Sequence, residues 1–133
     1  MIHIDPSDGT PIYRQIIDQV KRMVLTGSLA PGDQIESVAS LAGRVRVNPM
    51  TVSKAYSTLV EAGVLERRRG VGLFVAESVE QSTRDDREDL LDRELRSAAA
   101  LLVQLDIDED EASRRLRAHM QTFRNEEEGN DHE

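Results

Sequence analysis

One segment constrains the fold more than any other: a helix that begins at Asn48-Pro49 and is followed by a basic turn rich in glycine. Asparagine is a favoured helix-capping residue and proline suits the first helical position, so this pair fixes where the helix starts. Gly63 is predicted to end the helix. The next residues include Arg67-Arg68-Arg69-Gly70-Val71-Gly72, which predict a hairpin between short strands at 64–68 and 73–76. The fold must therefore place a helix beside a basic hairpin.

Two more helices are predicted before this segment. The first lies between Thr10-Pro11, interpreted as its cap and first position, and Gly27, where it stops. Ser37 is predicted to cap the second, and a turn around Arg46-Val47 connects it to the third. Three helices and a hairpin predict a winged helix-turn-helix over residues 10–76, so the fold class is mainly α with a small β-hairpin. The predicted core consists of apolar residues at helical spacing: Ile12, Tyr13, Ile16, Ile17, Val20, Val24, Val38, Leu41, Ala42, Val45, Val52, Ala55, Tyr56 and Leu59.

The residues after position 76 differ in charge and pattern. Residues 1–76 hold 9 Lys and Arg against 7 Asp and Glu, whereas residues 77–133 hold 8 against 18. Residues 77–87 are predicted to be a linker or the start of a helix, and residues 126–133 an acidic, frayed tail. Between them, residues 88–125 are predicted to form two helices separated by Asp106–Asp110, because their apolar residues repeat at spacings of three and four.

Two short helices cannot enclose their own apolar faces, so something else must cover them. A twofold-related copy of the chain is the economical answer, and we expect a homodimer. The alternative is that the apolar faces pack onto the winged domain. The residues expected in the dimer interface are Leu91, Leu95, Ala98, Leu102, Leu105, Leu116, Met120 and Phe123, with Ala112 on the same face of the second helix.

Composition excludes several classes of protein. The absence of cysteine excludes disulfides, thiolate zinc sites and cysteine nucleophiles. The three histidines, His3, His119 and His132, are scattered, so no metal site or cofactor is expected and an enzyme is the least favoured class. The N-terminus lacks a basic region followed by an apolar run, and nowhere do 18 apolar residues follow one another. We therefore expect a soluble, cytoplasmic protein without a membrane partner.

The helix that begins at Asn48 carries short polar side chains in its first turns, which is typical of a helix that reads base edges in the major groove. Arginines beside a glycine turn are suited to bind phosphates or an adjacent groove, although strand alternation means that not all three face the same way. The alternative is an ordinary solvated helix face, and Met50 could either meet a thymine methyl or fold back against the turn. The predicted contacts with double-stranded DNA are Ser37, Arg44, Arg46, Asn48, Met50, Thr51, Ser53, Lys54, Ser57, Arg67, Arg68, Arg69, Gly70 and Gly72.

Four segments together resemble a known family. They are Pro11-Ile12-Tyr13-Arg14-Gln15-Ile16, Gly27-Ser28-Leu29-Ala30-Pro31-Gly32-Asp33, Asn48-Pro49-Met50-Thr51-Val52-Ser53-Lys54-Ala55-Tyr56 and Gly70-Val71-Gly72-Leu73-Phe74-Val75. In order and spacing they are similar to the N-terminal domain of GntR-type bacterial transcription regulators. The short two-helix remainder resembles the YtrA-type subfamily, which implies a dimerising C-terminal region too small to be a large effector domain. The resemblance also implies repression of operons for membrane transporters.

The sequence departs from the pattern of that family in two places. The family usually has Pro-Ser-x-Arg at the start of the second helix, where this chain has Glu36 at the proline position and Ala39 at the arginine position. The missing arginine removes an expected DNA contact. In the hairpin, Val71 and Leu73 replace a common lysine and the usual threonine. The three preceding arginines are available to compensate.

We therefore expect a homodimeric transcription regulator, more specifically a repressor, that binds a twofold-symmetric operator through paired winged helices. One alternative is a winged-helix module whose arginines meet an acidic protein partner. Another is a DNA-binding protein without sequence preference. The sequence identifies neither the operator, nor the regulated genes, nor any small-molecule effector.

Overall fold

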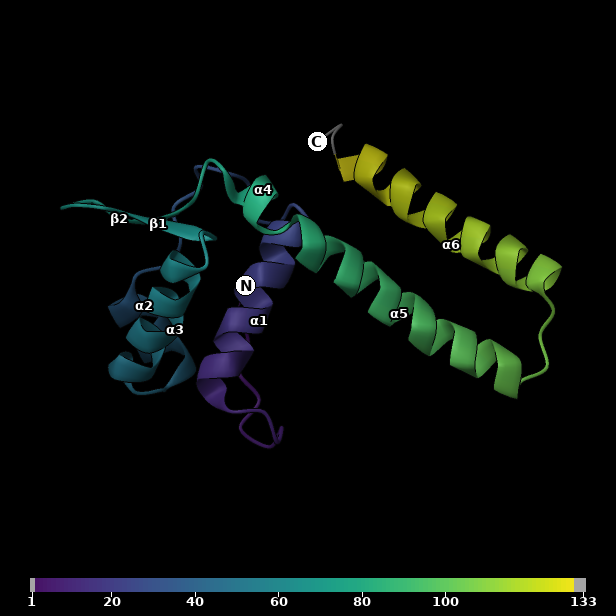
Figure 1. The fold of residues 1–133 in the computed structure, drawn as a ribbon, viewed down its shortest axis with the longest axis horizontal. Helices are drawn as coiled ribbons and strands as arrows, with labels where there is room; N and C mark the ends of the chain where they lie inside the picture. The colour runs from purple at the N-terminus through teal and green to yellow at the C-terminus, as the bar shows by residue number, and fades with distance from the viewer. Residues whose placement is uncertain (1, 131–133) are drawn as a thin grey trace. The chain divides into compact units, whose positions relative to one another are not determined.

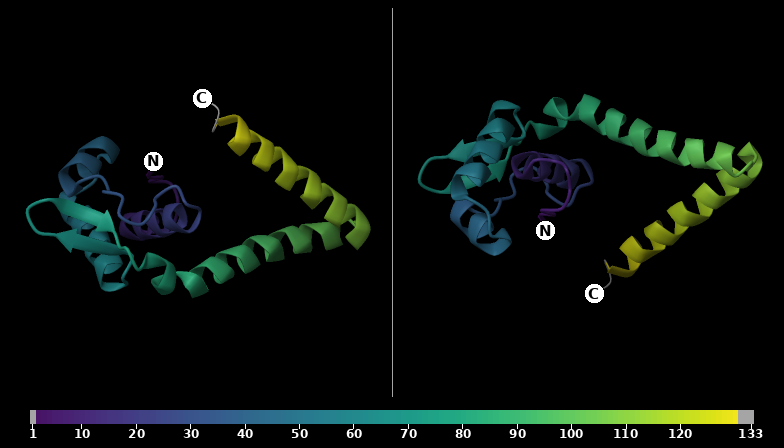
Figure 2. Two further views of the ribbon diagram at one scale, coloured as in Figure 1. Left: turned by 90° about the horizontal axis from the view of Figure 1, so that it is seen from above. Right: turned by 90° about the horizontal axis from the view of Figure 1, so that it is seen from below.

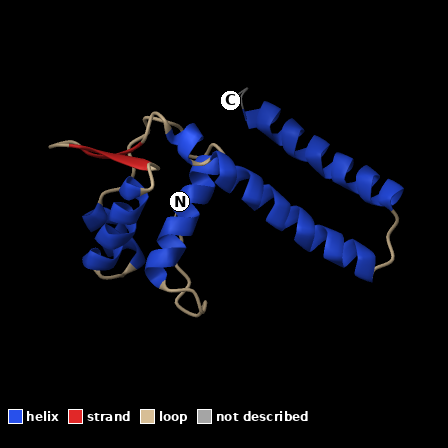
Figure 3. Cartoon of the chain, in the orientation of Figure 1, coloured by secondary structure: helices blue, strands red, loops and turns tan. Residues whose placement is uncertain are grey.

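The structure is a computed structural model that describes residues 2–130. Those residues form two compact units, one up to Glu88 and one from Asp89 onward. We call the first the winged unit; helix α5 crosses the boundary between them. In chain order the elements are α1 (Ile12–Leu25), α2 (Val38–Val45), α3 (Pro49–Glu61), β1 (Leu65–Arg68), β2 (Gly72–Val75), α4 (Val79–Ser82), α5 (Arg84–Gln104) and α6 (Glu109–Asn130) (Figure 1 and Figure 3).

The core of the winged unit is built around α3, which packs against α1, α2 and β1 (Figure 2). The predicted fold class, mainly α with a small hairpin, is confirmed. Because its apolar residues fall on one side of the helix, α3 buries that side and leaves the other exposed. The fully buried core residues of the three helices are Ile16, Ile17, Val20, Leu41, Ala42, Val52, Ala55, Tyr56 and Leu59, joined from the hairpin by Val64, Leu65 and Val75.

Two of the three predicted helix caps are confirmed. The Asn48 side chain accepts a hydrogen bond from the Met50 amide at 2.8 Å, and the Ser37 hydroxyl accepts one from the Ser40 amide at 3.1 Å. The predicted cap at Thr10 is wrong, because Pro11 occupies the cap position and makes no side-chain bond there. The Thr10 carbonyl instead accepts a hydrogen bond from the buried amide of Gln15, which holds the chain before α1 in place.

The hairpin pairs β1 and β2 antiparallel, with Leu65 opposite Val75 and Arg68 opposite Gly72. Each strand lies one residue from its predicted start. A third segment, absent from the sequence prediction, lies along β2: the Ile35 amide donates to the Leu73 carbonyl at 2.9 Å, and the Val75 amide donates to the Asp33 carbonyl at 2.7 Å. This segment leads directly into α2, so the hairpin is coupled by backbone hydrogen bonds to the helices.

Residues 77–87, predicted to be a linker or a helix start, form α4 and the beginning of α5. Helix α5 ends at Gln104, so Leu105 lies in the following turn and not on the helix as predicted. The left-handed backbone of Asp106, with φ of 57°, closes this helix end. The tail from residue 126, expected to be frayed, continues α6 as far as Asn130, because glutamates favour helix. Residues 131–133 lie outside the described residues.

Candidate nucleic-acid interface

The exposed side of α3 carries the residues predicted to read bases. Met50, at the second position of the helix, is 78% exposed, and Ser53 and Lys54 are also exposed. Thr51 and Ser57 are half-buried. The opposite side of the helix is anchored in the core, so this exposed surface is held rigidly on a regular element. A rigid helix face that projects short polar side chains suits entry into a major groove.

Lys54 makes a contact that the sequence did not predict. Its ammonium lies over the ring of Tyr13, 4.8 Å from the ring centroid. Tyr13 belongs to α1 and packs partly against the core. An exposed cation–π contact of this kind stabilises by about 0.5–1 kcal/mol. The contact therefore orients Lys54 while leaving its charge accessible.

Ser37, Asn48 and Arg46 lie at helix ends. Ser37 and Asn48 accept helix amides with their side-chain oxygens, so both are engaged as caps in the free protein. Arg46 ends α2 in the left-handed region, with φ of 57°, and is exposed. A non-glycine residue in this conformation is uncommon, and here it makes the sharp turn between α2 and α3. The exposed Arg46 lies in the short turn that leads to the start of α3 at Pro49.

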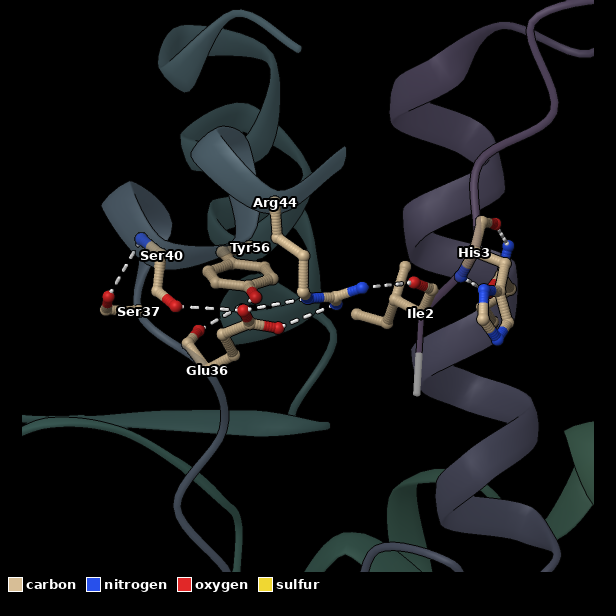
Figure 4. Close-up of polar contacts among 8 residues, drawn as sticks. Ile2, His3, Glu36, Ser37, Ser40, Arg44 and Tyr56 are labelled. Carbon is tan, nitrogen blue, oxygen red and sulfur yellow. Dashed lines mark hydrogen bonds and ion pairs between the residues drawn. The ribbon is translucent and has the colours of Figure 1, made fainter. Parts of the chain in front are cut away.

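Arg44 is engaged within the winged unit. Figure 4 shows its guanidinium directed at the carboxylate of Glu36, with Nη2 to Oε2 at 2.8 Å and Nε to Oε1 at 3.1 Å. Its Nη1 also donates to the carbonyl of Ile2 at 3.1 Å. The hydrogen bond from Arg44 holds the pKa of the Glu36 carboxyl below its usual range, although partial burial opposes the shift. Arg44 is thus paired with a carboxylate that stays ionised at neutral pH.

Tyr56 adjoins this pair from α3. Its hydroxyl donates to the backbone carbonyl of Glu36 at 2.9 Å (Figure 4). Burial raises the pKa of Tyr56 to about 12, and the nearby Glu36 carboxylate adds to the shift. The hydroxyl therefore keeps its proton and remains a donor at neutral pH. This confirms that Tyr56 belongs to the core and shows where its hydroxyl is directed.

The three arginines of the hairpin have different environments. Arg68 lies over the ring of Phe74 at 4.1 Å and pairs with Glu66 at 2.9 Å and Glu77 at 3.7 Å. Arg67 and Arg69 are exposed and have no carboxylate partner among residues 2–130. Strand alternation places neighbouring side chains on opposite faces, as the sequence predicts. Two of the three arginines are therefore free to meet an anion.

The glycines at the tip of the hairpin have backbone conformations that suit their residue type. Gly70 has φ of 76° and Gly72 has φ of 139°, both in the region that favours glycine. A side chain at Gly72 would also collide with the Gln34 amide, since its Cβ would lie 2.8 Å from Nε2. Gln34 donates to the Val71 carbonyl at 3.1 Å and so ties the tip to the segment before α2. Gln34 carries no sequence pattern that would have identified this role.

A groove separates the hairpin from the start of α2. It is lined by Gln34, Ile35, Ser37 and Val38 on one side and by residues 67–73 on the other. The groove, Arg46 and the exposed face of α3 all belong to the winged unit. Of the predicted DNA contacts, Arg44 and Arg68 are the two whose cationic groups are held by carboxylates.

The residues expected in a dimer interface lie on α5, on α6 and in the turn between them. Within the described part of the chain, no residue of either helix is buried. Leu102 is half-buried and Ala98 is exposed. Leu101 and Val103, which were not predicted, are exposed as well, as is His119. The exposed large apolar residues of the predicted set are Leu91, Leu95, Leu105, Leu116, Met120 and Phe123.

The fold and this surface define a winged-helix DNA-binding protein, and comparisons with known proteins give its family. The sequence profile described as "Bacterial regulatory proteins, gntR family" matches residues 12–75. The HTH-type transcriptional repressor YtrA of Bacillus subtilis (strain 168) is 49% identical over 78 residues, which cover 59% of this chain and 60% of that protein. The uncharacterized HTH-type transcriptional regulator YhcF of the same organism is 41% identical over 85 residues, 64% of this chain and 69% of that protein.

Solved structures agree with the sequence comparison. YtrA from Sulfolobus acidocaldarius, described as a GntR-family transcription factor, has a TM-score of 0.56 and 36% identity, covering 71% of this chain and 96% of that chain. The DNA-binding domain of AraR in complex with operator ORX1 has a TM-score of 0.50 and 28% identity, covering 55% and 90%. The chain belongs to the GntR family of bacterial transcription regulators. Its named relatives are regulators, so the prediction of a regulator and not an enzyme is confirmed.

None of the helices in the part of the chain that the structure describes is both long enough and apolar enough to span a membrane.

Proposed function

We propose that this chain is a homodimeric repressor that binds a twofold-symmetric operator through two copies of its winged unit. The observation that carries the DNA-binding part is the combination of an exposed polar face on α3 with two unpaired arginines, Arg67 and Arg69, at the adjacent hairpin. In this proposal the polar face of α3 reads base edges, and Arg67 and Arg69 bind phosphates. A DNA target also implies a cytoplasmic location.

The distribution of charge supports this assignment of roles. The chain is acidic overall, with a formal net charge of −8, but the excess of carboxylates lies in residues 77–133. DNA binding depends on local positive charge, so the acidic half does not oppose it. The AraR DNA-binding domain, which has the same fold, is seen in complex with an operator. By similarity to the repressor YtrA, we assign repression rather than activation.

The uncovered apolar residues of α5 and α6 support the dimer. Large side chains such as Leu95, Met120 and Phe123 are 45%, 44% and 65% exposed, and the exposure of several large apolar side chains favours an interaction site. A second copy brings an identical surface, which is complementary under twofold symmetry. In this proposal residues 10–76 bind DNA, residues 88–125 form the dimer and 77–87 join the two.

The test is selection of bound duplexes from a random-sequence library by the full chain. We expect an inverted repeat whose half-site centres are about 10–10.5 base pairs apart, or a multiple of that spacing, because each recognition helix enters one major groove. Sedimentation of the complex should give two chains per duplex. Placing the selected duplex over a promoter should lower transcript yield when the protein is added.

Three outcomes would contradict parts of the proposal. Failure to enrich any duplex would favour a protein-interaction module whose arginines meet an acidic partner. Equal affinity for all duplexes would point to binding without sequence preference. A single half-site bound by one chain would contradict the dimer but leave DNA recognition intact.

A further inference from the structure

The Glu36–Arg44 pair is the feature of the winged unit that DNA binding as proposed above does not use. Both carboxylate oxygens of Glu36 accept from Arg44, at 3.1 and 2.8 Å. The hydroxyl of Ser40, one turn along α2, donates to the same carboxylate at 2.9 Å. Less than a third of either side chain is exposed, 31% for Arg44 and 28% for Glu36. A bidentate arginine–carboxylate contact with a third donor is a strong and geometrically specific interaction.

This pair lies where four parts of the winged unit meet. Ile35, the preceding residue, is hydrogen bonded to β2, and Ser37, the next residue, caps α2. The carbonyl of Glu36 accepts from Tyr56 of α3 at 2.9 Å. Arg44 extends the connection to the N-terminal segment through the carbonyl of the buried residue Ile2. Figure 4 shows these groups converging on one another.

The N-terminal segment is in turn fixed to α1. The Gln19 side chain accepts from the His3 amide at 2.8 Å and donates to the His3 carbonyl, while Gln15 accepts from the Asp5 amide at 2.9 Å and donates to its carbonyl at 2.9 Å. A continuous set of hydrogen bonds therefore runs from α1 through the N-terminal segment, α2 and residue 36 to α3. Each residue in this set makes a hydrogen bond with at least one other residue of the set.

We propose that Glu36 and Arg44 are positioning residues that fix α2 and the hairpin relative to the recognition helix α3, and that Arg44 does not bind a phosphate. This inference rests on the proposed DNA-binding function. It assigns a role to Glu36, which occupies the position where the resembled family has proline. A phosphate that recruited Arg44 would leave the Glu36 carboxylate without its main partner close to a polyanion, which is electrostatically unfavourable.

The test compares affinities of the full chain for two duplexes: one selected by the wild-type chain from a random library, and a scrambled duplex of the same length and composition. Fluorescence anisotropy titrations over a range of salt concentrations give the affinity, the ratio between the duplexes and the salt slope. The variants are Glu36→Gln, Arg44→Lys and the two combined. Arg114→Lys, at an exposed position of α6, is the matched control.

We expect Glu36→Gln and Arg44→Lys each to weaken binding to the selected duplex by roughly 3- to 30-fold, with a smaller effect on the scrambled duplex. The salt slope should stay unchanged, because no phosphate-binding group is removed. The combined variant should bind no more weakly than the worse single variant, since both changes break the same interaction. Arg114→Lys should match the wild type in every quantity.

Opposite results would overturn the proposal. If the carboxylate merely masks a phosphate-binding arginine, Glu36→Gln should bind both duplexes more tightly and with a steeper salt slope. Arg44→Lys keeps the positive charge but loses the bidentate geometry. If this variant binds like the wild type, that result alone contradicts the positioning role, even if Glu36→Gln fails to fold. Circular dichroism and melting curves establish that every titration is done well below unfolding.

The same experiment separates this proposal from the function on which it rests. A wild-type chain that does not prefer its selected duplex overturns the proposed function and the positioning role together. A wild-type chain that prefers it, with Glu36→Gln and Arg44→Lys both unchanged, overturns only the positioning role.

Discussion

At the scale of single residues, Lys54 has an intramolecular partner in the Tyr13 ring and, in the proposed complex with DNA, a competing partner on the duplex. The contact with the Tyr13 ring is worth about 0.5–1 kcal/mol at an exposed site. A hydrogen bond between a charged donor and an acceptor contributes about 1.5–3 kcal/mol net. In the proposed complex, a base edge or phosphate would therefore win the competition for the Lys54 ammonium. The ring contact keeps the Lys54 side chain beside the exposed side of α3, so in the proposed complex it lowers the entropy lost on binding.

Replacing Lys54 with alanine should weaken operator binding by about 1–3 kcal/mol if the side chain reads a base. The circular dichroism spectrum should not change, because Lys54 is exposed. The chain has one other lysine, Lys21, which lies 3.9 Å from Asp86 in the winged unit. Lys21→Ala is the matched control and should bind like the wild type. Equal operator affinity of the two variants in gel-shift titrations would remove Lys54 from the interface.

Some residue roles could be predicted from the sequence because they depend on near neighbours. Asn48 and Ser37 cap helices by bonding amides two and three positions away, and such contacts follow from local preference. The partners of Arg44 could not be predicted, since Ile2 lies 42 positions away and Glu36 faces it only once α2 has formed. The cap predicted at Thr10 was wrong by one position, because the helix cap lies at Pro11, which offers no side-chain acceptor.

At the scale of elements, the arginines of the hairpin differ in their partners, and the proposed function assigns DNA binding only to those without an ion pair. Arg68 makes two ion pairs and a ring contact, all within the winged unit. Arg67 and Arg69 make no ion pair with the described residues. If Arg68 left its carboxylate partners to bind a phosphate, Glu66 would remain as an unpaired carboxylate beside the DNA. The free arginines can bind a phosphate without such a penalty.

Replacing Arg67 and Arg69 together with alanine should therefore lower affinity for every duplex. The salt slope should fall by about 0.9 for each phosphate that the variant no longer neutralises. Arg68→Ala removes a charge from the same hairpin and is the matched control. It should leave the slope unchanged and lower the melting temperature, because the Phe74 ring loses its cover. A slope that falls only in Arg68→Ala would reverse the assignment.

The elements themselves were largely predictable, and the failures have a common cause. Helices α1 to α3 and the hairpin follow from helical spacing, caps and glycine turns. The pairing of residues 33–35 with β2 was not predicted, because a segment so short has no alternation of its own and is defined by its partner. The position of Leu105 beyond the end of α5 depends on the left-handed turn at Asp106. Backbone conformations of single non-glycine residues are not encoded in apolar spacing.

At the scale of the whole molecule, the sequence predicted the two C-terminal helices and favoured a second copy of the chain as what covers them. Heptad-like spacing specifies an apolar stripe, and a stripe is compatible with several partners. In the described residues no member of the stripe is buried on either helix. Linking two winged units makes the second binding event intramolecular, which raises operator affinity without any new DNA contact. The strength of DNA binding should therefore depend on these helices even though they do not touch DNA in this proposal.

Replacing Leu95 and Leu102 together with aspartate should convert the proposed dimer to a monomer. Both residues lie on the same side of α5, and a carboxylate buried there without a partner costs several kcal/mol. The winged unit has its own core and should keep its fold, but operator affinity should fall steeply because two half-sites are no longer engaged together. Val103→Asp is the control, since Val103 is 80% exposed and lies about 100° around the helix from Leu102. Sedimentation should show a dimer for the wild type and for this control. A monomeric wild type, or a double variant that remains a dimer, would show that α5 does not form the interface.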